Sequence, residues 1–445
     1  MRKKVSLSVL LIMLMTAVFP QTATAEVLTE GLPQIDAASY IVIEGSTGEV
    51  LFGKDYTAQA DPVGLVKMMT AVLAIENGDM EKIITIGDIP SEKIQGTRTV
   101  MLRKAEKLKL GYLVQAIVIE SANDAAYVVA DAIGANENKF VDMMNEKAKS
   151  LGMNNTVFTN VYGLTDANQL TTAEDMAVLG RYAMSIGAYR DMAGTKSFQW
   201  PGETYNGQIL SNTNPLLEIM PEATGVKAGY VKEYGEDGKE YANLVGAAQK
   251  DGRELIGVIL GGSSESTIGT DMQTILNYGF EQTKVVPVVQ KEAAMTNIAY
   301  GDKKQIRVVA GESYSLVRPA DNNAIVEMQM TLNDISLPIK KDQKVGVLTI
   351  FSDGATIGEV PLVSMDDARG SINWLFIITA IMTILYLAQI ILRTYRMLRK
   401  SYYNARSAEP QQRSGGNGRR EAAGQENTSS KRKSLSDRSN RPLDR

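Results

Sequence analysis

The stretch "DPVGLVKMMTAVLAIENG", Asp61 to Gly78, decides the fold, because it predicts a helix with one charged side chain in its first turn. Apolar residues follow Gly64 at the three- and four-residue spacing that places side chains on one helix face. Gly64 lies at the start of this helix, and Lys67 follows three residues later on the same side. The motifs in the rest of the chain determine whether these two residues belong to a reactive site.

The segments around this helix predict a mixed α/β domain. The stretch "SYIVIEGSTGEVLFGKDY" at 39–56 contains two apolar runs around a Gly-Ser-Thr-Gly turn and predicts a β-hairpin. Further helical patterns follow at 110–124, 126–133, 137–152 and 171–187, strands return at 223–232, 241–249 and 254–262, and a helix is expected near 270–283. Strands, then helices, then strands predict one sheet assembled from both ends of the domain, with a helical block between. We assign residues 26–283 to this domain.

A second, smaller domain follows at 284–366. Short alternating segments such as "QIRVVAG", "YSLVRPA" and "KVGVLTIFSDG" predict an all-β structure there. It contains no cluster of polar residues that suggests chemistry, so we expect a spacer or a docking surface.

Composition narrows the chemistry. The 445 residues suffice for two or three domains, and the modest net charge of −4 gives no indication of nucleic-acid binding. The chain has no cysteine and no histidine, which excludes disulfides, thiolate metal ligands, the usual zinc sites and a Ser-His-Asp relay. We therefore expect no cofactor and no metal ion, and a hydrolase built on this chain would need lysine, a carboxylate or tyrosine as its base.

Both ends of the chain indicate export and anchoring. Residues 1–25 have the positive, apolar and small-residue parts of a secretory signal, which predicts cleavage before Glu26. The run "INWLFIITAIMTILYLAQIIL" is long enough to cross a bilayer, so we expect a transmembrane helix at 371–393. Arg393, Arg396, Arg399 and Lys400 follow it and place the C-terminal side in the cytoplasm.

The remaining segment, 394–445, is expected to be a basic, disordered cytoplasmic tail. Its clusters of lysine and arginine either contact anionic lipid or are simply solvated. The domains before the membrane helix should therefore lie outside the cell membrane, attached to it by a single helix.

Three short motifs recur in an order that carries chemistry. Lys67 lies three residues after Gly64, Ser121-Ala122-Asn123 follows a long apolar helix, and Lys227-Ala228-Gly229 opens a predicted strand. Taken singly, they are a solvated lysine, a helix cap and a strand-edge charge. Taken together, they match the order S-x-x-K, S-x-N and K-T-G of penicillin-binding enzymes.

The resemblance extends beyond these motifs. With "NEKAKSLGMNNTVFTNVYGL" at 145–164, "TTAEDMAVLGRYAM" at 171–184 and "SNTNPLL" at 211–217, the chain resembles the low-molecular-weight D-alanyl-D-alanine carboxypeptidases of serine peptidase family S11. The resemblance covers about Ala37 to Phe280, and the β domain is similar to the C-terminal domain of that family. It implies a penicillin-binding, β-lactamase-like transpeptidase fold and action on peptidoglycan.

The resemblance also implies a role for each motif residue. Lys67 would be the base, Ser121 a proton relay, Asn123 the anchor of the substrate amide and Lys227 the partner of its carboxylate, with Gly229 on the strand that pairs with the substrate. Two positions depart from the family pattern. Gly64 stands where the family has its nucleophilic serine, and Ala228 stands where it has the carboxylate-binding threonine.

These departures leave three interpretations. The first is a degenerate, catalytically inactive pseudoenzyme that binds or scaffolds at the cell wall, with stem peptides or wall enzymes as partners. The second is an active carboxypeptidase with an unusual mechanism, in which Ser121 attacks with Lys67 or Lys227 as base. The third is a purely structural presenter of the β domain or the tail.

Overall fold

The computed structural model describes residues 28–203, 207–231, 241–300, 304–334, 336–369 and 374–406. The predicted signal peptide and the tail beyond residue 406 lie outside these described residues. The described residues up to Arg369 belong to one compact unit, and those from Trp374 onward belong to another.

The first unit is organised around a five-stranded antiparallel sheet with the order β2-β1-β9-β8-β7. Its strands are β1 (Ala37–Glu44), β2 (Val50–Lys54), β7 (Ala223–Val231), β8 (Tyr241–Lys250) and β9 (Arg253–Gly262). The first strand pairs with β9 from Ala37↔Gly262 to Glu44↔Leu255. The prediction of one sheet assembled from both ends of the domain is therefore confirmed, and β7 lies at its edge.

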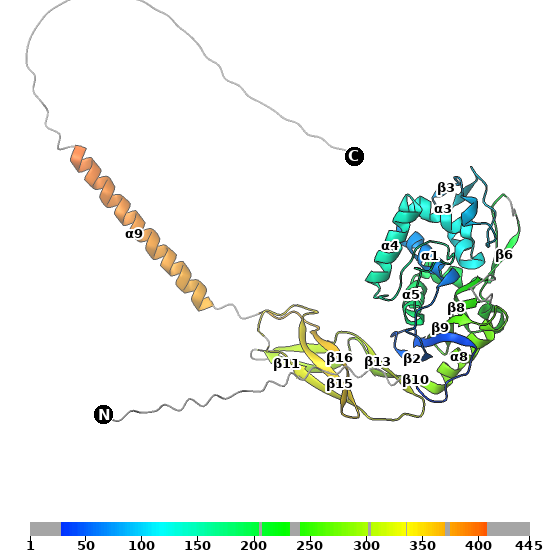
Figure 1. The fold of residues 1–445 in the computed structure, drawn as a ribbon. Coiled ribbons are helices and arrows are strands. Elements are labelled where there is room, and N and C mark those ends of the chain that lie inside the picture. Colours follow the sequence, from blue (N-terminus) through cyan, green and yellow to red (C-terminus); the bar gives the residue numbers. More distant parts are fainter. Residues whose placement is uncertain are drawn as a thin grey trace, which may run out of the picture. The chain divides into compact units, whose positions relative to one another are not determined.

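Helices cover both faces of this sheet (Figure 1). One face packs against α1 (Val66–Asn77), α5 (Ala173–Ser185) and their neighbours α2 (Leu110–Gln115), α3 (Asn123–Gly134), α4 (Glu137–Ser150) and α6 (Gly187–Ala193). The other face packs against α8 (Ile268–Gln282) and the short α7 (Leu216–Ile219). Each strand supplies both layers because successive side chains point to opposite faces: Ile41 and Ile43 face the first layer, and Tyr40 and Val42 face the second.

The long apolar helix predicted at 110–124 is interrupted. It is α-helical only to Gln115, continues as a π-helical turn over Ala116–Glu120, and ends at Ser121, which has the left-handed conformation (φ 64°, ψ 35°). A new helix, α3, begins at Asn123. Single π-turns of this kind occur frequently at functional sites, and here the break coincides with the Ser-x-Asn motif.

The C-terminal part of this unit is all-β. A five-stranded sheet has the order β11-β12-β16-β15-β14, and β10 pairs with β13 beside it. The strands are β10 (Thr283–Val289), β11 (Ala294–Tyr300), β12 (Lys304–Ala310), β13 (Tyr314–Pro319), β14 (Val326–Leu332), β15 (Lys344–Ser352) and β16 (Ala355–Ser364). Strand β11 was not predicted from the sequence, because its apolar residues are spaced irregularly around a register shift near Thr296. Two short antiparallel pairs precede this β domain in the chain: β3 (Ile83–Thr85) with β4 (Lys107–Lys109), and β5 (Ser197–Gln199) with β6 (Ile209–Ser211).

The second unit contains α9 (Trp374–Arg406). Its segment Trp374–Asn404 is long and apolar enough to cross a membrane, judged by length and composition. The helix extends farther than predicted, so residues 394–406, which we assigned to a disordered tail, are helical. The reason is compositional: residues 393–406 contain no glycine or proline, and Arg, Met, Leu and Lys are good helix formers. The predicted fold class, a mixed α/β penicillin-binding domain followed by a β domain and one apolar helix, is confirmed.

Candidate active site

Gly64 lies in a short 3₁₀ turn, Val63–Leu65, that leads into α1. A Cβ built on Gly64 would lie 3.7 Å from the Oγ of Ser121 and 3.7 Å from the carbonyl oxygen of Ala228. The fold therefore brings residues of all three motifs together at one point. Residue 64 faces the Ser-x-Asn turn on one side and the Lys-x-Gly strand on the other.

The backbone around Gly64 is packed too closely for a side chain. The same Cβ would lie 2.9 Å from the Cα of Gly229, and a Cβ on Gly229 would lie 2.8 Å from the nitrogen of Gly64. On its other side the turn meets Gly163, which has a φ of +82° and whose Cβ position would fall on the carbonyl group of Val63. The turn is thus enclosed between two glycines, and strand β7 lies in backbone contact with the start of α1.

Lys67 is buried in the first turn of α1. Its Nζ donates a hydrogen bond to the carbonyl oxygen of Tyr162 at 2.5 Å. Burial, with a smaller contribution from the positive charge of Arg98, lowers the pKa of Lys67 to about 7. An amine with this pKa is partly neutral near pH 7, which is the state a general base requires.

The Ser-x-Asn motif is built by the helix break described above. Ser121 and Asn123 are both buried, with 7% and 4% of their surfaces exposed. The N-terminus of α3 carries no side-chain cap, so the motif does not act as a helix cap. Instead, the backbone N–H of Asn123 donates to the carbonyl oxygen of Arg98 at 2.8 Å, which ties the motif to the preceding loop.

Lys227 lies within β7, in its middle, whereas the sequence suggested that its motif opens the strand. Although β7 is an edge strand, Lys227 is 1% exposed, so it is not a strand-edge charge. Its Nζ donates to the carbonyl oxygen of Ala228 at 3.0 Å and to Oγ1 of Thr213 at 3.4 Å. Burial and the nearby charges of Lys67 and Arg98 lower the pKa of Lys227 well below its usual value.

Ala228 is the residue for which the family resemblance implies a carboxylate-binding threonine. Its methyl group belongs to the apolar layer that also contains Leu244 and Met272, and it is 1% exposed. The position therefore offers packing and no hydrogen-bonding group.

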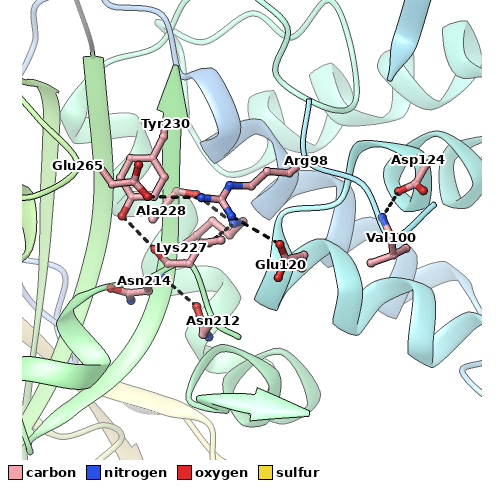
Figure 2. A network of polar contacts seen from close by, with 11 residues as sticks. Arg98, Val100, Glu120, Asp124, Asn212, Asn214, Lys227, Ala228, Tyr230 and Glu265 are labelled. Carbon is pink, nitrogen blue, oxygen red and sulfur yellow. Dashed lines mark hydrogen bonds and ion pairs between the residues drawn. The ribbon is translucent and has the colours of Figure 1, made fainter. Parts of the chain in front are cut away.

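Sequence reasoning missed Arg98. Its guanidinium lies between Glu120, 3.5 Å away at the end of the π-turn, and Glu265, 3.4 Å away in the loop before α8 (Figure 2). Arg98 thereby links the helical side of the site to the sheet side near Lys227. No motif marks this residue, because it reaches the site from a loop between predicted elements.

The hydroxyl of Thr70, one turn beyond Lys67, is buried and donates to the carbonyl oxygen of Val161 at 2.6 Å. Among the described residues there is no group of three or more Asp, Glu, His or Cys side chains that could hold a metal ion.

Family models match both parts of the chain. Residues 25–264 match the model described as D-alanyl-D-alanine carboxypeptidase, and residues 280–369 match that of the penicillin-binding protein 5 C-terminal domain.

Individual relatives match along most of their length. The chain is 29% identical over 372 residues to the D-alanyl-D-alanine carboxypeptidase DacF of Bacillus subtilis, covering 82% of this chain and 94% of that protein. It is 30% identical over 352 residues to DacA of Escherichia coli, covering 76% and 85% of the two chains. The solved structure of penicillin-binding protein 5 from Haemophilus influenzae superposes with a TM-score of 0.65 at 25% identity, covering 76% of this chain and 99% of that one. The chain therefore belongs to the D-alanyl-D-alanine carboxypeptidase family.

Proposed function

We propose that this chain is a catalytically inactive member of its family, attached to the cell membrane by α9, that binds or scaffolds at the peptidoglycan wall. One observation carries the proposal: residue 64, which faces both other motifs, is a glycine whose backbone is packed against Gly229. Glycine has no oxygen with which to form an acyl-enzyme.

The size of the expected loss supports inactivity. Removing the nucleophile of a serine hydrolase lowers turnover by roughly 10⁶, and only a residual of about 10³–10⁴ over water remains from binding and oxyanion contacts. The close approach of β7 adds to this loss. The backbones of Gly64 and Gly229 lie so close together that any side chain at residue 64 would have to move one of them.

The remaining polar groups favour retained recognition of peptide or wall components. Arg98 lies near Lys227 of the edge strand β7, and its carbonyl oxygen accepts the backbone N–H of Asn123. An edge strand can accept an extended peptide as an added strand. The predicted partners are accordingly stem peptides or wall enzymes. A cell-membrane location with both N-terminal domains outside and the C-terminal residues in the cytoplasm follows from the arginines after residue 392.

A second candidate, an active carboxypeptidase with Ser121 as nucleophile, is favoured by one observation: the pKa of Lys67, lowered to about 7, suits a base. The test is to incubate the full-length chain with a peptide ending in D-Ala-D-Ala and to measure released D-alanine and binding heat. We expect no release above the rate without protein, and weak binding that Lys227→Met abolishes. Release that Ser121→Ala abolishes would overturn the proposal, and absence of both release and binding would favour a purely structural role.

A further inference from the structure

Strand β14 (Val326–Leu332, "VEMQMTL") forms an edge of the C-terminal sheet and pairs with β15 alone among the described strands. Its seven residues pair with β15 in unbroken register, from Val326↔Ser352 to Leu332↔Gly346. Exposed edges are usually protected by charged side chains, especially lysine, by proline or by a bulge. This strand has one charged side chain, Glu327, and no lysine, proline or bulge, whereas the opposite edge strand β11 has a register shift near Thr296.

The exposed surface of β14 is apolar on one side. Met328 is 53% exposed, Met330 40% and Leu332 39%. These residues lie opposite Ile350, Leu348 and Gly346 on β15, and Ile350 and Leu348 belong to the core of this domain. The side chains of Met328, Met330 and Leu332 therefore extend the apolar core face of the sheet to its edge, where they are exposed to solvent.

The direction of the backbone groups follows from one hydrogen bond. The N–H of Asn333 donates to the carbonyl oxygen of Val345 at 2.9 Å, in register with the Leu332↔Gly346 pair. In an antiparallel pair, main-chain groups alternate between the two sides of a strand. Those of Glu327, Gln329 and Thr331 consequently face β15, and those of Val326, Met328, Met330 and Leu332 face outward.

We propose that β14 pairs antiparallel with β14 of a second copy of this chain, about a twofold axis at Gln329. In this register Met328 lies opposite Met330 and Val326 lies opposite Leu332. Each outward-facing main-chain N–H or C=O group of one copy therefore meets an outward-facing group of the other. Glu327, the one ionisable side chain of the strand, lies opposite Thr331. No like charges face each other, and the two apolar strips join into one.

Charge is the reason to choose a second copy over another partner. An edge that selects a charged peptide usually presents complementary charge. The residues of β14 whose main-chain groups face outward have uncharged, apolar side chains, which can pack against the same residues of a second copy. The contact of one strand pair is small, and attachment of both copies to one membrane would raise their effective concentration. This last argument rests on the anchoring proposed above.

The absence of cysteine from the chain permits a direct test in membranes. Directly opposite residues that are not hydrogen-bonded to each other have Cα atoms about 4.5 Å apart, within the range of a disulfide. Oxidation of the full-length Gln329→Cys variant should therefore yield a covalent dimer. Glu327→Cys alone should yield at least tenfold less, and Glu327→Cys expressed together with a differently tagged Thr331→Cys should yield the mixed dimer.

Two controls make the test decisive. Asp353→Cys, on the exposed β15–β16 turn, reports random collision. Met330→Pro added to Gln329→Cys removes an outward N–H and spares the bonds to β15, so it should abolish the dimer without lowering the thermal unfolding midpoint by more than a few degrees. The proposal is overturned if Gln329→Cys forms no more dimer than Asp353→Cys, if Glu327→Cys alone dimerises as well, or if Gln329→Cys joins a different protein.

Discussion

The Cα of Gly229 lies too close to the position that a side chain of residue 64 would take, since a Cβ on Gly64 would lie 2.9 Å from it. Heavy atoms at that separation repel strongly, so no other residue fits at position 64 unless β7 or the 3₁₀ turn moves. The glycine at position 64 and the close approach of β7 are therefore two aspects of one packing arrangement. Restoring the serine hydroxyl alone does not restore the space around it.

Gly64→Ser should accordingly acquire little reactivity. We expect labelling by a fluorescent penicillin to be at most a few per cent of the protein, because the new side chain must displace Gly229 before it can face a substrate. Gly64→Ala is the matched control, since it introduces the same Cβ without the hydroxyl. Stoichiometric labelling of Gly64→Ser would show that β7 moves readily and would contradict this account.

The same contact should be visible as a loss of stability. Gly64→Ala inserts a methyl group into a fully packed region, which typically costs about 1–3 kcal/mol, and should lower the unfolding midpoint of residues 26–369. Gly187→Ala is the control, because a Cβ at Gly187, the first residue of α6, meets no atom within 4 Å. That change should be neutral or stabilise by about 0.4–1 kcal/mol. Equal midpoints for the two variants would argue against a closed contact at Gly64.

Lys67 should make stability depend on pH. Its pKa is lowered from 10.5 to about 7 in the folded chain, so between these values the unfolded chain binds a proton that the folded chain lacks. The contribution of Lys67 to the free energy of unfolding therefore rises with pH between these two pKa values, by up to about 1.4 kcal/mol per pH unit. Lys67→Met should lose this rise between pH 7.5 and 9.5.

A lysine elsewhere provides the comparison. Pairing with Glu81 raises the pKa of Lys109, so Lys109 keeps its proton in both states across the same window. Unfolding midpoints measured from pH 7.5 to 9.5 should have the wild-type slope in Lys109→Met and a smaller slope in Lys67→Met. Identical slopes in all three proteins would mean that Lys67 is charged in the folded chain.

Much of this site was predictable from sequence. The order of strands and helices, the three motifs and their convergence followed from hydrophobic periodicity and from the family resemblance. The approach of Gly229 to Gly64 was not predictable, because two glycines 165 residues apart carry no pattern that reveals contact. Arg98 was missed for a related reason: loop residues reach a site through tertiary structure, and periodicity does not report where a loop leads.

The burial of Lys227 could not be predicted from the sequence either. Lys227 on an edge strand reads as a solvated residue, yet its 1% exposure follows from the segment around Thr213 that packs beside β7. The extent of α9 was underestimated because the change from apolar to basic residues suggested an end to the helix. A helix continues across such a change when its residues keep good helix propensity.

The direction of the chain across the membrane can be tested with single cysteines. In intact cells, a membrane-impermeant maleimide should label Asp353→Cys, and it should label Ser414→Cys only after the cells are lysed. This outcome follows from the basic residues that succeed the apolar part of α9. The opposite labelling pattern would place the β domain in the cytoplasm and would contradict the proposed location.

The central claim is that the chain cannot form an acyl-enzyme. The most direct measurement is the intact mass of the unaltered full-length chain after prolonged incubation with excess penicillin. We expect an unchanged mass, because glycine at position 64 has no side-chain oxygen that could carry an acyl group. A mass increase equal to one penicillin, assigned by peptide mapping to Ser121 or another residue of the site, would contradict it.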